Sequence, residues 1–430
     1  MKGLLHVALH SAWNRRGTLA LVVLSIALAT ALLLGLERLR SDIRSSFTQA
    51  VSGTDLIVGA RTGPVQLMLY SVFRVGGATN NIGMDSVRAV AAHRAVSWVV
   101  PLSLGDSHRG HPVLGTTPEY FTRFAYGDRQ PLAVVQGRAF SGTLDGLYEA
   151  VLGAEVAQAL GYGLGQRITL SHGLGSVGGA LGAEHGDKPF TVVGVLARTG
   201  TPVDRTVHVS LQAIEAIHLD WVGGAPLPAA AGLKIAPELA RKFDLEPKQV
   251  TAALVGLKNR VAVFNVQRFV ANYEPEPLLA VLPGVALDEL WTAVGLGERA
   301  LMAMSGLVAL VSLASLVAVV LAGLNERRRE LAVLRAVGAG PRHVLWLLLA
   351  EGLLITGLGA LLGLGCSLAA VALAAPWVQA QFGIALQSSL PGASQWALLA
   401  AVLMAGMLAS LVPAARAYRL SLADGLSPRV

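Results

Sequence analysis

The stretch NERRRELAVLRAVGAGPRHV, residues 325–344, lies between two long apolar runs and holds five arginines and two glutamates. Leu331, Leu334 and Val337 recur at every third residue, which places them on one side of a helix. Gly338 suits the left-handed turn at which a helix ends, and the proline three residues later suits the first turn of the next helix. The pattern predicts a helix that leaves one membrane span, a tight turn, and a second helix that enters the next span.

Two interpretations of this loop are open. Clustered arginines can serve only to hold a loop in the cytoplasm by the positive-inside rule. That rule requires no apolar face, however, so the spaced leucines favour a surface on which a cytoplasmic partner docks.

The whole chain has the composition of a membrane protein. Of its 430 residues, 53% are hydrophobic and 14% are charged, whereas soluble domains carry about 25% charged residues. Residues 18–36, 300–324 and 352–415 contain no charged side chain. Because one crossing takes about 20 residues, the last run is long enough for two spans, and we expect Pro376 and Pro391 to divide it.

The predicted fold class is therefore a membrane protein with four transmembrane α-helices and a large mixed α/β extracytoplasmic domain between the first and second spans. In chain order, the predicted parts are a cytoplasmic amphipathic helix at 1–17, the first span at 18–36, the external domain at 37–298, the second span at 299–324, the cytoplasmic loop at 325–342, the third span at 343–374, an external connection at 375–393, the fourth span at 394–412 and a cytoplasmic tail at 413–430.

The distribution of charge predicts the orientation. Residues 37–298 hold 22 Lys and Arg against 23 Asp and Glu, whereas the rest of the chain holds 12 against 4. By the positive-inside rule, both ends and the central loop are cytoplasmic, and the long block is outside. The basic pI of about 9.8 then reflects topology, so we reject a nucleic-acid-binding function.

The first 17 residues offer a second interpretation of the N-terminus. They place apolar residues and Trp13 on one helical face, as in helices that lie in the membrane interface. A signal peptide also starts with a basic residue and an apolar core, but the uncharged run of residues 18–36 is long for such a core. We expect the first span to be retained.

The external block alternates strand and helix signals. Residues 54–60, 95–105 and 251–259 predict strands, residues 150–170 predict a strand, a helix that stops at Gly161 and a strand, residues 190–217 predict two strands and a helix, and residues 263–273 predict a helix.

The central stretch resembles the coupling loop of the FtsX-like, MacB-type ABC transporter permeases. The similar residues run from Arg329 to Ala339, and EGLLITGLGALLGL follows from Glu351. The segments HPVLGTTPEYF, VLGAEVAQALGYGLGQRITL and FTVVGVLARTGTPVDRTVHV resemble the extracytoplasmic core domain of the same family, and VPAARAYRLSLADGL resembles its ending. Together with the spans, the resemblance covers most of the chain.

The resemblance implies a bacterial inner-membrane permease that works with a cytoplasmic ABC ATPase subunit and with a second permease copy or a related permease. In that family the coupling loop seats in a groove of the ATPase, and the spans transmit ATP-driven motion to the external domains. The work is export of a periplasmic cargo, extraction of lipid or lipoprotein, or control of an external enzyme, in some cases with a periplasmic accessory protein. The expected ATPase-coupling residues are Arg329, Glu330, Leu331, Leu334, Arg335, Gly338 and Ala339.

The sequence contains neither a P-loop nor a serine-hydrolase motif. Lysine never follows glycine, so no P-loop pattern exists, and the G-x-S-x-G pattern of serine hydrolases does not occur. We therefore expect a non-catalytic subunit without a cofactor, whose ATP is bound by a separate partner chain. This departs from family members that carry a fused ATPase domain.

Histidines and one intramembrane acid are the remaining candidates. The segments SHRGH (107–111) and EHGD (184–187) could supply metal ligands, but their spacing fits no compact zinc signature, and we interpret the external histidines as solvated loop residues. Glu351 is the only acid within a predicted span, where a charge is expensive. It is either a coupling or proton-handling group or, as we favour, a carboxylate paired with an arginine or with backbone. Gly359 and Gly363 form a small-xxx-small pair suited to close helix packing.

Two other functions are left open. One is a signalling or scaffold protein that senses an external ligand without transport, including an FtsX-like regulator of an external enzyme. The other, supported only by the external histidines, is a metal-handling permease. A neighbouring gene for a P-loop ATPase would favour the transporter.

Overall fold

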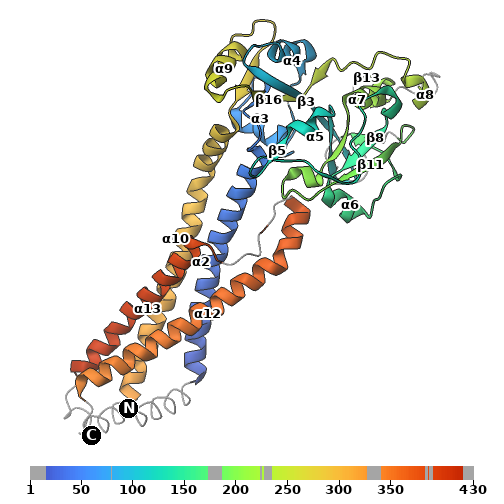
Figure 1. Ribbon diagram of the computed structural model, residues 1–430. Helices are drawn as coiled ribbons and strands as arrows, with labels where there is room; N and C mark the ends of the chain where they lie inside the picture. The colour runs from blue at the N-terminus through green and yellow to red at the C-terminus, as the bar shows by residue number, and fades with distance from the viewer. Residues whose placement is uncertain are drawn as a thin grey trace. The chain divides into compact units, whose positions relative to one another are not determined.

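The computed structural model describes residues 16–78, 80–172, 186–222, 225–226, 235–326, 340–382, 386 and 391–419 (Figure 1). The chain divides into two compact units. The helical unit comprises residues 1–42, 294–377 and 386–430, and the sheet unit comprises residues 43–293 and 378–385.

Within the described residues, four helices are long and apolar enough to cross a membrane. They are α2 (Arg16–Val51), α10 (Pro283–Glu326), α12 (Pro341–Phe382) and α13 (Ala393–Arg419). The large sheet-containing insertion lies between the first and second of them, which confirms the predicted fold class.

Helix α12 continues through Pro376, where the sequence predicted a break. A proline inside a helix removes one backbone hydrogen bond and costs about 3 kcal/mol. The residues beyond it belong to the sheet unit. There the Arg198 guanidinium donates a hydrogen bond to the side-chain oxygen of Gln379 (3.1 Å), a contact that helps to hold the added turns and that no local pattern predicts.

The sheet unit is built on an eleven-stranded sheet, counted over the described residues, with the strand order β17-β1-β16-β3-β4-β12-β8-β11-β7. Strand β10 pairs with β3, and β9 pairs with β11. The strands are β1 (Leu56–Ala60), β3 (Val96–His108), β4 (His111–Thr116), β7 (Val134–Gly137), β8 (Glu149–Leu152), β9 (Arg167–Ile168), β10 (Ser171–His172), β11 (Phe190–Leu196), β12 (Val207–Ser210), β16 (Ala252–Leu257) and β17 (Leu278–Val281).

Short elements complete the unit. The helices are α3 (Pro64–Ser71), α4 (Met84–Ala91), α5 (Glu119–Arg123), α6 (Ala154–Leu160), α7 (Leu211–His218), α8 (Pro237–Ala240) and α9 (Val263–Ala271), and the small strand pairs are β2 (Ile82–Gly83) with β15 (Gln249–Val250), β5 (Ala125–Tyr126) with β6 (Gln130–Pro131), and β13 (Trp221–Val222) with β14 (Ala225–Pro226).

The 13-residue strand β3 joins two halves of this sheet. Towards β16, β1 and β17 all pairs are antiparallel, and α4 and α9 cover a buried apolar cluster (Figure 1). Towards β8 and β11 the pairing is mixed, and α6 and α7 contribute to a second cluster. The predicted order of strand, helix, glycine stop and strand is confirmed in β8, α6 and β9, where Gly161 ends the helix in the left-handed conformation (φ 67°).

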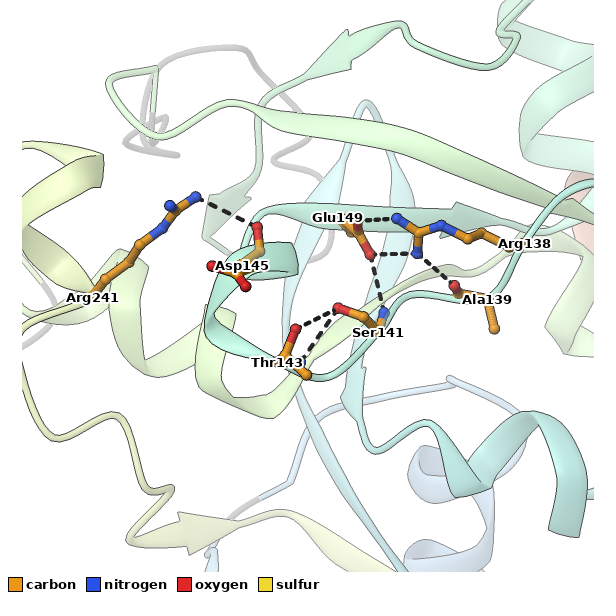
Figure 2. A network of polar contacts seen from close by, with 7 residues as sticks. All are labelled: Arg138, Ala139, Ser141, Thr143, Asp145, Glu149 and Arg241. Carbon is orange, nitrogen blue, oxygen red and sulfur yellow. Dashed lines mark hydrogen bonds and ion pairs between the residues drawn. The ribbon is translucent and has the colours of Figure 1, made fainter.

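A polar network fixes the loop between β7 and β8 (Figure 2). Arg138 holds the Glu149 carboxylate with both terminal nitrogens, and the Ser141 amide donates to the same carboxylate (3.0 Å). The Ser141 and Thr143 hydroxyls lie 2.9 Å apart. This loop is therefore held both by directed bonds at the surface and by the buried side chains of Phe140 and Leu147.

Candidate functional site

Helices α12 and α13 approach each other at two glycines. A Cβ atom on Gly352 would overlap the Ser410 hydroxyl, and one on Gly406 would overlap Thr356. In both helices the hydroxyl residue follows its glycine by four positions and donates a 2.8 Å hydrogen bond to the carbonyl of that glycine. The hydroxyls are thus satisfied within their own helices, and the missing side chains let the two backbones come close.

Besides α13, helix α12 contacts α2, and this second contact falls at the predicted small-xxx-small pair. A Cβ atom on Gly363 would lie 2.6 Å from the Ala27 carbonyl oxygen and 2.7 Å from Thr30 Cβ. One on Gly359 would lie 2.7 Å from Ile26 Cγ2. The predicted packing role of Gly359 and Gly363 is confirmed, and α12 is held between two neighbours by glycine contacts.

Hydroxyl and amide groups link α2 to the other two helices. The hydroxyls of Ser25 on α2 and Ser312 on α10 are hydrogen-bonded at 2.9 Å. The buried side-chain amide of Gln395 on α13 donates to the Leu34 carbonyl on α2 (3.3 Å). Such bonds are typical between helices in lipid.

The histidines of the β3–β4 hairpin correct one sequence-based interpretation. His108 and His111 are buried, not solvated. They lie directly opposite each other, because Arg109 and Gly110 form a two-residue turn with positive φ angles (47° and 83°). His108 Nδ1 lies 2.6 Å from the Thr169 carbonyl oxygen, so this nitrogen donates.

His208 on β12 is also buried, and its Nδ1 donates to the Val151 carbonyl (3.2 Å). Burial, reinforced by the charge of Arg74, lowers the pKa of His208 to about 3. This histidine is neutral at physiological pH and belongs to the core.

A cavity of about 580 Å³ opens beside Arg74. The Arg74 Nε and Nη1 atoms are buried and have no hydrogen-bond partner among the described residues, and its backbone is left-handed (φ 58°). Burial lowers the pKa of Arg74 and raises the pKa of the neighbouring Tyr120 to about 12. The Arg74 charge thus lies in a buried setting next to Tyr120, and its two unpartnered nitrogens are not open to the cavity.

Two protein-family models match the chain. The model described as FtsX-like permease C-terminal matches residues 302–422, and the one described as MacB-like periplasmic core domain matches residues 17–233, more than half of the chain. The chain belongs to the FtsX-like, MacB-type family of ABC transporter permeases. Permeases of this family are generally non-catalytic membrane subunits.

Solved structures similar to the permease include two outer domains of related proteins. The periplasmic region of MacB from Actinobacillus actinomycetemcomitans is 12% identical, with a TM-score of 0.34, over 57% of this chain and 97% of that one. The extracellular domain of YknZ, a noncanonic ABC-type transporter from Gram-positive bacteria, is 13% identical, with a TM-score of 0.28, over 47% and 89%. No curated protein matches the chain significantly. At these scores, the two structures add nothing to the family assignment.

The predicted coupling residues of the permease lie outside the described residues. They are Arg329, Glu330, Leu331, Leu334, Arg335, Gly338 and Ala339, and their roles stay predictions. Glu351 is described: it is partly buried on α12, directly before the α13-contacting Gly352. Both interpretations of Glu351 remain predictions.

Proposed function

We propose that this permease is the transmembrane subunit of an ABC transporter whose ATPase is a separate chain. It converts ATP hydrolysis by that partner into movement of the sheet unit, for export or extraction of a periplasmic, lipid or lipoprotein cargo. The chain itself binds no nucleotide, and two permease copies, or this chain and a related one, complete the assembly. A periplasmic accessory protein is a further proposed partner.

The observation that carries this proposal is the continuity of two helices. Helices α2 and α10 run without a break from the helical unit into the sheet unit: residues 43–51 and 283–293 of these helices belong to the latter. A continuous helix is stiff over its length, so a displacement at one end is passed on to the other.

Helix α12 supplies the link to the partner. It begins at Pro341, directly after the predicted coupling residues, and its glycines hold it against α13 and α2. A force applied before Pro341 would therefore be passed to α2 through the close glycine contacts between α12 and α2.

We propose that both termini and residues 325–342 are cytoplasmic and that the sheet unit lies outside the bacterial inner membrane. In a Cys366→Ser background, a thiol reagent that cannot cross membranes should label Ser176→Cys in cells whose outer membrane has been removed and whose inner membrane is intact. Ser427→Cys should react only after the inner membrane is permeabilised. Equal labelling of both positions before permeabilisation contradicts this orientation.

The coupling role is tested by Leu334→Asp, with Arg335→Ala as the milder companion. Placing a charge in an apolar contact should abolish co-purification of the ATPase, because loss of one buried leucine costs about 2–5 kcal/mol even without a charge. Arg335→Ala should retain most binding, since exposed ion pairs contribute about 0–1 kcal/mol. The measurement is co-purification of the ATPase, with membrane insertion and sheet-unit folding as controls. Normal ATPase binding by a folded Leu334→Asp protein contradicts the proposal.

A further inference from the structure

Three side chains that are far apart in the sequence meet at one end of the mixed half of the sheet. Strand β10 pairs antiparallel with β3, which places His172 opposite Asp106. Helix α7 ends at His218, beside them. One ligand atom from each residue lies within 4.8 Å of the other two.

The distances suit ligands around a common centre. The Nε2 atoms of His172 and His218 are 3.1 Å apart. One imidazole offers a single nitrogen to an ion, so with both Nε2 atoms as ligands the carboxylate distance that applies is the 3.9 Å between Asp106 Oδ1 and His218 Nε2. The 2.9 Å contact of Asp106 Oδ1 is with the other ring nitrogen of His172, Nδ1. Two nitrogens bound to tetrahedral zinc at about 2.0–2.1 Å would be separated by about 3.3 Å, close to the observed spacing.

The tautomer of His218 is fixed by its own helix. Its Nδ1 lies 2.7 Å from the Ile214 carbonyl oxygen, which can only accept, so Nδ1 carries the hydrogen. In the neutral ring, Nε2 then presents a lone pair towards His172. Either a proton on His172 or a metal ion must occupy the space between the two nitrogens. A backbone carbonyl on the far nitrogen is the usual second contact of a metal-binding histidine.

Asp106 provides a second, independent observation. It is only 5% exposed, and apart from the nearby ring nitrogens of His172 and His218 its Oδ1 has no hydrogen-bond partner among the described residues. A buried carboxylate without compensation is strongly unfavourable. The buried ammonium of Lys188 is paired with Asp220 instead. A divalent cation held by the two imidazoles would supply positive charge next to the Asp106 carboxylate.

We propose that Asp106, His172 and His218 form a binding site for a divalent transition-metal ion, with Zn²⁺ as the best match to two imidazoles and one carboxylate. Three protein ligands leave one position open, as in zinc sites that bind water or a further ligand. That position faces solvent, because the side chains of His172 and His218 are 32% and 29% exposed, whereas the side chain of Asp106 alone is 6% exposed. The site departs from the sequence-based expectation of no metal.

The test uses the full-length protein in detergent, purified through a tag without histidine and stripped with a chelator. Equilibrium dialysis against Zn²⁺, with metal content measured by mass spectrometry, should give one ion per chain. Asp106→Asn, His172→Gln and His218→Gln should each weaken binding at least about tenfold. His93→Ala is the matched control, because His93 lies two residues beyond α4 and contacts Phe269 instead, and it should bind zinc like the wild type.

Two further measurements distinguish loss of metal binding from loss of folding. Circular dichroism without metal should be the same for wild type and Asp106→Asn, which preserves side-chain shape. Co²⁺ bound in place of Zn²⁺ should give visible absorption bands that Asp106→Asn alters. Absence of zinc binding by the wild type, or equal affinity in His172→Gln/His218→Gln, overturns the proposal and favours a proton shared by the imidazoles. The outcome is independent of the ATPase, so it is separate from the test of transport.

Discussion

Helix α12 makes its closest approaches to α2 and α13 at glycines, beside a smaller cluster of buried side chains, whereas strand β3 places large buried side chains in the main apolar cluster of the sheet unit. On α12, the closest approaches fall at Gly352 and Gly363, where even a Cβ atom would collide with the facing helix. On β3, Val100 and Leu102 are 1% and 0% exposed within an apolar cluster. The same chain thus uses two opposite ways to hold its elements together.

The difference follows from the surroundings expected for each unit. Burying apolar surface from water stabilises a domain by about 25 cal/mol per Å². Between helices in lipid this driving force is absent, so close backbone packing and interhelical hydrogen bonds replace it. The helical unit should therefore be sensitive to atoms added at glycines, and the sheet unit to changes in what it buries.

The largest effect is expected from an added side chain on α12. Gly363→Leu would drive a side chain against the Ala27 carbonyl and the Ala31 amide nitrogen, and backbone atoms cannot move aside like a flexible side chain. We expect destabilisation of about 3 kcal/mol or more, the upper end for overpacking. The measurement is the thermal stability of the detergent-solubilised protein, followed by size-exclusion chromatography after heating.

Gly365→Leu is the matched control for this change. It makes the same substitution two residues further along α12, at a position with no atom within 4 Å of the added Cβ. It should melt close to the wild type. Equal stability of the two variants would mean that the α2–α12 contact is not held by glycine packing.

The sequence predicted those features of the fold that depend only on a local pattern of residues. The strands at 54–60 and 190–196 follow from local residue patterns, and Gly359 and Gly363 follow from small-residue spacing. It did not predict the Gly352–Ser410 contact, because nothing in either segment specifies its partner. The buried histidines were missed although the signal was present: Arg109-Gly110 is a two-residue hairpin turn, which places the flanking residues in strands.

Contacts between residues far apart in the chain explain why other features of the candidate sites were not predicted. His172 meets Asp106 only because β10 joins β3, and these strands are separated by six other strands in the chain. Arg74 gave no sequence signal, since its unused donors are evident only from the surrounding burial. The coupling residues rest on family resemblance and local periodicity.

A smaller effect is expected in the sheet unit, from proton binding at His208. Its folded-state pKa of about 3 lies below the ordinary value of 6.5, so below pH 6.5 the unfolded chain takes up a proton that the folded chain does not. Stability should therefore fall as pH falls from about 6.5 towards 3. The loss from this group is on the order of 1 kcal/mol by pH 5.5.

His208→Gln isolates this contribution, because glutamine can donate to the Val151 carbonyl but does not titrate. The buried Asp204 and the partly buried Glu215, whose carboxyl pKa values are raised mainly by desolvation, change stability in the opposite direction with pH. They are present in both proteins and cancel in the comparison. Thermal unfolding followed by circular dichroism at pH 7.5 and 5.5 should show a smaller loss of stability for His208→Gln than for wild type. An identical loss of stability in the two proteins would mean that the His208 ring takes up a proton in the folded state as well. Water would then have to reach this part of the core.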